Sequence, residues 1–149
     1  MGWHSLRGRF RECPDPPYLL DKTGPVKQSE FPGLGFQMVQ IELAGCGSDR
    51  DITRLIGAAL GYPDAFVGGW DAFDDLLGDV VVEARRFVAV HVLDASEFLR
   101  NDVRLFARTV WLLMNTTESV GRLGGGSAQL EFILWGEWTR SFPDQDSPP

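Results

Sequence analysis

The sequence feature that most constrains the fold is an almost unbroken apolar run, Phe87–Leu93, which reads Phe-Val-Ala-Val-His-Val-Leu. A short run rich in β-branched valine is typical of a strand that is covered on both faces. Such strands belong mainly to parallel sheets, whose crossover connections require helices. The run therefore predicts an α/β fold in which helices pack on a parallel sheet.

The segments on either side of this run complete the expected domain. Two further strands are predicted from alternation or β-rich composition, at Phe36–Leu43 and Gln129–Trp135. Apolar stripes at helical spacing predict three helices, at about 49–60, 70–77 and 102–115. Ser48 is expected to cap the first of these helices and Gly61-Tyr-Pro63 to end it. The expected order is β-α-α-β-α-β, one α/β domain with a small three-stranded, largely parallel sheet.

The ends of the chain have a different composition. Five of the nine prolines fall in residues 1–35, which predicts a partly irregular N-terminal extension. Residues 139–149 resemble a solvated tail. The expected domain therefore spans residues 36–138.

Composition narrows the class of protein. The 149 residues are 44% hydrophobic, which is sufficient for a buried core. No apolar run approaches the roughly 18 residues of a membrane-spanning helix, and the basic start has no apolar stretch behind it. We therefore expect a cytoplasmic protein, with no membrane association and with a monomeric state.

Cysteine and histidine give no sign of catalysis or of metal binding. Cys13, Cys46, His4 and His91 are far apart in the sequence and form no ligand motif. His91 lies inside the apolar run, so a hydrogen-bonded core histidine is the favoured interpretation. We expect no metal, no cofactor and no enzymatic activity, and two ordinary thiols rather than a disulfide.

The negative charge is concentrated in one segment. The chain has a net charge of −7, and residues 64–83 alone contain six acidic and no basic residues. A localised acidic surface favours a basic protein partner and disfavours direct nucleic-acid binding. Asp71, Asp75 and Asp79 repeat at spacing four, where like charges repel by about 0.2–0.5 kcal/mol per pair. A short helix that retains this repulsion is a candidate for a binding site.

The predicted partner-binding residues are the acids of this helix and the aromatic–glycine loop before it: Phe66, Gly68, Gly69, Trp70, Asp71, Asp74, Asp75 and Asp79. Aromatic side chains beside charges are typical of interface hot spots. The alternatives are a solvated helix face with no function and, less favoured, a carboxylate pair of a glycosidase.

Residues 62–77 also resemble the segment that defines barstar-type ribonuclease inhibitors. Asp71, Ala72 and Asp75 match its Asp-Ala and second Asp without a gap, and Phe73 fills the apolar position between them. The order of elements over about residues 36–136 is similar as well. Four positions depart from the family pattern, and they are Ala65 (often Tyr), Val67 (Gly), Gly69 (Asn) and Asp74 (sometimes Trp).

The resemblance implies an inhibitor that blocks a small secreted ribonuclease. Asp75 would mimic a phosphate in the basic active site, and Asp71 would lie one turn earlier. Glu118 is the nearest candidate for a further family glutamate. The alternative function is a regulatory or interaction domain of the same fold that does not bind a ribonuclease.

Overall fold

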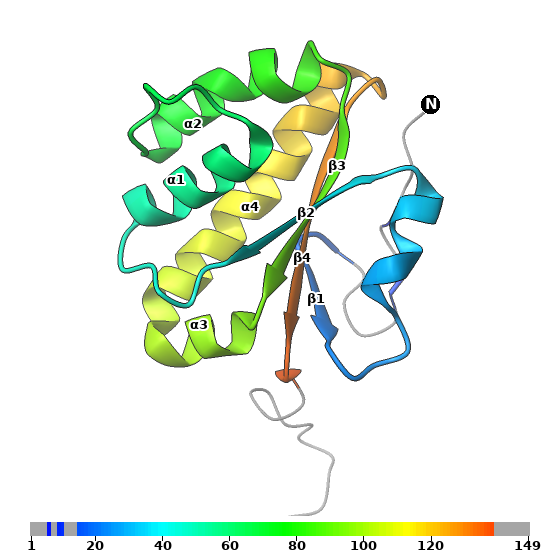
Figure 1. Ribbon diagram of the computed structural model, residues 1–149, viewed down its shortest axis with the longest axis vertical. Helices are drawn as coiled ribbons and strands as arrows, with labels where there is room; N and C mark the ends of the chain where they lie inside the picture. The colour runs from blue at the N-terminus through cyan, green and yellow to red at the C-terminus, as the bar shows by residue number, and fades with distance from the viewer. Residues whose placement is uncertain (1–5, 7–8, 11–14, 139–149) are drawn as a thin grey trace, which may run out of the picture.

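A four-stranded, fully parallel sheet forms the centre of the molecule (Figure 1). The computed structural model describes residues 6, 9–10 and 15–138. The spatial order of the strands is β1-β4-β3-β2. Their bounds are β1 Tyr18–Asp21, β2 Gln37–Glu42, β3 Phe87–Leu93 and β4 Gln129–Gly136. β3 and β4 are therefore central, and β1 and β2 lie at the edges.

The prediction of three strands was wrong, because residues 18–21 add a fourth. β1 pairs with β4 in parallel, and Tyr18 lies opposite Ile133. Four residues between prolines are too few to show a strand pattern, and the pairing partner is more than a hundred residues away. The segment is a strand because of this tertiary contact rather than because of its local sequence. The division of the chain at residues 35 and 138 stays a prediction.

The helices agree with the predicted positions at their starts, but two features were missed. The helical segments are α1 Asp49–Leu60, α2 Trp70–Leu77, the π-helical turn η3 Gly78–Val82, α3 Ala95–Asn101 and α4 Val103–Gly124. α3 was not predicted, and α4 continues well beyond the expected end at Asn115. Its second half contains poor helix formers, yet Thr116, Thr117 and Val120 continue the buried stripe. Packing therefore overrides propensity there.

The strands alternate between two apolar layers, one on each face of the sheet. Val88, Val90 and Val92 of β3 pack in the layer that contains the helices. Ala89 of the same strand packs in the other layer, together with Phe31 of the N-terminal segment. Phe31 lies between the two short turns η1 Gln28–Glu30 and η2 Pro32–Leu34. Figure 1 shows the helices on one side of the sheet and these turns on the other. Both faces of the central strands are thus covered.

His91 is a buried residue of the second layer, which confirms its interpretation as a core histidine. It is 0% exposed, and the Trp135 indole N–H donates a hydrogen bond to its Nδ1 at 2.7 Å. Because an indole nitrogen only donates, the imidazole proton must reside on Nε2, which lies 3.2 Å from the Met38 sulfur. Burial lowers the pKa of His91 to about 4, so the ring is neutral at physiological pH.

Candidate partner-binding surface

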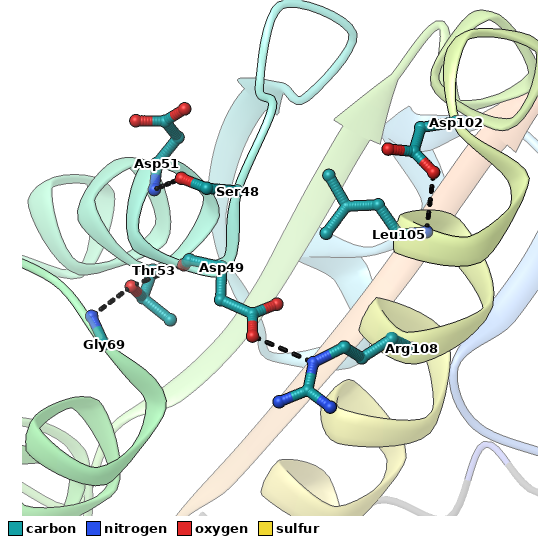
Figure 2. Close-up of polar contacts among 8 residues, drawn as sticks. All are labelled: Ser48, Asp49, Asp51, Thr53, Gly69, Asp102, Leu105 and Arg108. Carbon is teal, nitrogen blue, oxygen red and sulfur yellow. Dashed lines mark hydrogen bonds and ion pairs between the residues drawn. The ribbon is translucent and has the colours of Figure 1, made fainter.

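The candidate surface begins with α1, which is fixed at both ends by local sequence. The Ser48 hydroxyl accepts a hydrogen bond from the Asp51 N–H at 3.2 Å and caps the first turn (Figure 2). Gly61 ends the helix with φ 90°, a left-handed conformation that glycine adopts without strain. The predicted bounds of this helix are confirmed.

An aromatic cluster holds the connection between α1 and α2 against the core. Phe73 of α2 is 0% exposed and stacks on Tyr62, with ring centroids 5.1 Å apart. The Tyr62 hydroxyl donates to the Phe73 carbonyl at 2.8 Å. Phe66 packs edge-on against Tyr62 and fills the space next to Gly57, where a Cβ would lie 2.8 Å from the ring. This cluster fixes the position of the loop relative to both helices.

The loop reaches α2 through two glycines in left-handed backbone conformations. Gly68 has φ 101° and Gly69 has φ 106°, values that other residues adopt only with strain. The Gly69 N–H donates to the Thr53 hydroxyl of α1 at 2.7 Å, as Figure 2 shows. Gly69 is also the N-cap of α2 and provides no capping side chain. The two glycines, which the sequence analysis named as partner-binding residues, therefore position the start of α2.

The acids of α2 point away from the core. Phe73 and Leu77 form the buried face, while Asp71, Asp74 and Asp75 are exposed. Across the described residues, these three side chains have no ion pair and no hydrogen bond to a protein group. The combination of an anchored helix and unneutralised carboxylates suits a surface that binds cations.

Asp74 differs from its neighbours in its electrostatic environment. Partial burial raises its pKa, and the negative charges of Asp71 and Asp75 raise it further. Asp79, the fourth predicted acid, is exposed but lies in η3 rather than in α2. Since a π-helical turn changes the angular spacing of side chains, the sequence spacing of four does not give Asp79 the same direction as Asp75.

The predicted aromatic residues are less exposed than the acids. Trp70 is half-buried and packs edge-on against Phe73, with ring centroids 5.4 Å apart. Its indole nitrogen is buried without a hydrogen-bond partner among the described residues. Phe66 is likewise half-buried, whereas Val67 between Phe66 and Gly68 is 61% exposed. Val67 is an exposed apolar residue beside the predicted site that the sequence prediction did not name, although an apolar residue in a glycine loop was the available signal.

Other predicted features lie outside α2 and its preceding loop, or outside the described part of the chain. Glu118 is an exposed residue of α4. Cys46 is a free thiol, and burial, followed by the charge of Asp51, raises its pKa; Cys13 falls outside the described residues. Among the residues described, no His, Cys, Asp and Glu side chains cluster to hold a metal ion, and no helix has the length and apolarity to cross a membrane.

Together, the parallel sheet and the exposed acidic helix define a small parallel α/β domain with an acidic surface. Residues 36–131 match the family model for Barstar (barnase inhibitor), and because this is more than half of the chain, the protein belongs to the barstar family. No curated protein and no solved structure matches the chain. β1 lies outside the matched residues.

Proposed function

We propose that the protein inhibits a small secreted ribonuclease as an immunity or antitoxin protein, with α2 as the element that blocks the basic active site. The observation that carries the proposal is the set of exposed carboxylates, unpaired among the described residues, on a helix inside the barstar-family region. Such an inhibitor acts by occupying the site and needs no cofactor. It would act in the cytoplasm as a monomer.

The chemistry of a ribonuclease active site explains why acids would bind there. The enzyme stabilises negative charge on a phosphoryl group, so its site carries arginine, lysine or histidine side chains. A carboxylate accepts charge-assisted hydrogen bonds from the same groups. Asp75 would take the position of the phosphate. Asp71 lies four residues earlier, about 6 Å along the helix axis, and would contact a second cation.

The remaining candidates would play smaller parts. Asp74 and Asp79 would add to the field that attracts a basic partner. Trp70, Phe66 and the glycine pair Gly68–Gly69 would set the shape of the loop and exclude water around Asp75.

The experiment is an RNA-cleavage assay with barnase and a panel of other small basic ribonucleases, titrated with the protein. We expect at least one enzyme to be inhibited stoichiometrically. Asp75→Ala should then weaken binding by at least about 2 kcal/mol, or roughly 30-fold, the threshold for a buried hot spot, for which the barnase–barstar pair is itself a standard example. Asp71→Ala should weaken binding less.

A matched control removes the same charge elsewhere. Glu42 is exposed at the end of β2, and Glu42→Ala should leave inhibition within about twofold. If Asp75→Ala unfolds the protein and inhibition simply follows the folded fraction, the acid is structural. If no ribonuclease is inhibited, the alternative function, an interaction domain without ribonuclease binding, replaces the proposal.

A further inference from the structure

The loop before α2 lies directly on two arginine side chains of α1. A Cβ at Gly68 would be 2.7 Å from both the carbonyl oxygen and the Cγ of Arg50 and 2.9 Å from the Arg54 Cγ, so only a glycine fits beside α1 here. One residue further on, the hydrogen bond from the Gly69 N–H to the Thr53 hydroxyl ties the loop to the same face of α1 (Figure 2). Arg50 and Arg54 therefore flank the anchored loop.

The charges of these arginines are not neutralised within the described part of the chain. The nearby acids of α1 are engaged elsewhere: Asp49 pairs with Arg108 of α4 at 2.8 Å, and the Asp51 carboxylate accepts the Gly47 N–H at 3.2 Å. Figure 2 shows the Asp49 side chain directed to Arg108. Both Arg50 and Arg54 are exposed, and neither guanidinium has an ion pair or hydrogen bond to any described residue.

The aliphatic stems of Arg50 and Arg54 contact the chain three residues before Asp71, the first acid of α2. Gly68 and Asp71 are three residues apart, so their Cα atoms are separated by no more than about 11 Å. Exposed arginines therefore flank this loop on its α1 side, and an exposed acid follows it at the start of α2.

We propose that Arg50 and Arg54 are specificity-determining residues, and that they select a partner which presents a carboxylate beside its cationic site. This inference rests on the proposed function for the identity of the partner, but the charge arrangement itself does not. A partner whose contact surface is uniformly basic would meet both arginines and be repelled. Specificity commonly depends on such repulsion as well as on attraction.

The test uses two charged peptides and NMR signals of the ¹⁵N-labelled protein. Hexaglutamate should shift the Nε–H signals of Arg50 and Arg54 and the Gly68 amide, whereas hexaarginine should shift the amides around Asp71 and Asp75. The double variant Arg50→Gln/Arg54→Gln should weaken hexaglutamate binding by about tenfold, as expected for two exposed ion pairs, and leave hexaarginine binding unweakened.

The matched control is Arg104→Gln, which removes an exposed arginine of α4 and should change hexaglutamate binding by less than about twofold. Equal shifts at Arg104 and at the α1 pair would overturn the inference, because the peptide would then detect positive charge of any kind.

Binding measurements with ribonucleases distinguish a failure of this inference from a failure of the proposed function. With any enzyme that the protein inhibits, the double variant should bind more weakly. If it binds as tightly as the unmodified protein, the arginines are not specificity determinants although the inhibitor function stands. If no enzyme is inhibited while hexaglutamate still binds at Arg50 and Arg54, the proposed inhibitor function is wrong. The two arginines would then still be a binding site for carboxylates.

Discussion

Polar groups have opposite environments in two regions of the molecule. One is the N-terminal layer, which packs on the sheet face opposite the helices, and the other is the surface of α2. In the layer, His91 and Trp135 are buried and bonded to each other, and aromatic rings enclose them. On α2, Asp71 and Asp75 are exposed, carry the same charge and have no partner among the described residues. A buried polar group without a partner is costly, whereas an exposed one is solvated by water.

The comparison separates residues that hold the fold from residues that are available to a partner. Replacing residues of the N-terminal layer should reduce stability and leave the intrinsic affinity of the binding surface unchanged. Replacing acids of α2 should weaken partner binding without reducing the stability of the fold. A protein that evolved only for stability would not keep adjacent like charges on one short helix.

The sharpest way to break the comparison is to truncate Phe31. Its ring is 1% exposed and packs edge-on against His91, with centroids 4.9 Å apart. Phe31→Ala should lower the free energy of unfolding by about 3–5 kcal/mol, as for other buried phenylalanines, measured by urea denaturation. Val67→Ala, at an exposed site, is the control and should cost little. A loss below about 1 kcal/mol for Phe31→Ala would mean that the N-terminal layer is not part of the core.

The loss of folding stability at low pH tests the same layer, because His91 is buried in it. Because its pKa is lowered to about 4 in the folded protein from 6.5, the unfolded chain binds a proton first as pH falls. Stability should therefore decline between about pH 6.5 and pH 4, by about 3 kcal/mol in total from this group. Chemical denaturation across this range measures the slope, and His91→Gln should flatten it. An unchanged slope in the variant would assign the acid sensitivity to other groups.

The features that the sequence predicted are those that local chemistry controls. Ser48 and Gly61 mark the ends of α1 because a cap and a left-handed glycine act within one turn. β3 was recognisable because continuous burial makes a continuous apolar run. β1 and α3 were missed because four and seven residues carry too little periodicity, and their structure depends on the sheet and on α4.

The residues of the candidate site also divide into those that the local sequence predicts and those that it does not. The acids of α2 were visible in the sequence because charge and helical spacing can be read directly. Arg50 and Arg54 were not singled out, because their relevance depends on a contact between residues 16 positions apart, the hydrogen bond from Gly69 to Thr53. Nothing in the local sequence around α1 indicates that a loop will lie across it.

Asp75 lies in α2, whereas Asp79 lies in η3 beyond the end of that helix, and we expect the two acids to contribute differently to binding. If the proposed function holds, Asp79→Ala should act mainly on the rate of association, slowing it by about two- to fivefold, because an exposed charge at the edge contributes through the field. Raising the salt concentration should slow association of the unmodified protein in the same direction. Stopped-flow mixing with an inhibited ribonuclease measures both effects. An association rate that is independent of salt would contradict the role of the acidic surface.

The smallest expected effect comes from Asp74, a candidate binding residue whose negative charge lowers the stability of the fold. Its pKa is raised by partial burial and by the charges of Asp71 and Asp75, so the folded protein holds a proton more readily than the unfolded chain does. The charged form therefore destabilises the fold at neutral pH, and this penalty disappears below the ordinary carboxyl pKa of about 4. Asp74→Asn should raise the midpoint of thermal unfolding at pH 7 by the equivalent of about 0.2–0.5 kcal/mol and have no effect near pH 3. Asp64→Asn, in the exposed loop before α2, is the control and should not show this pH-dependent gain. A stabilisation that is equal at both pH values would show that the negative charge of Asp74 is not its cause.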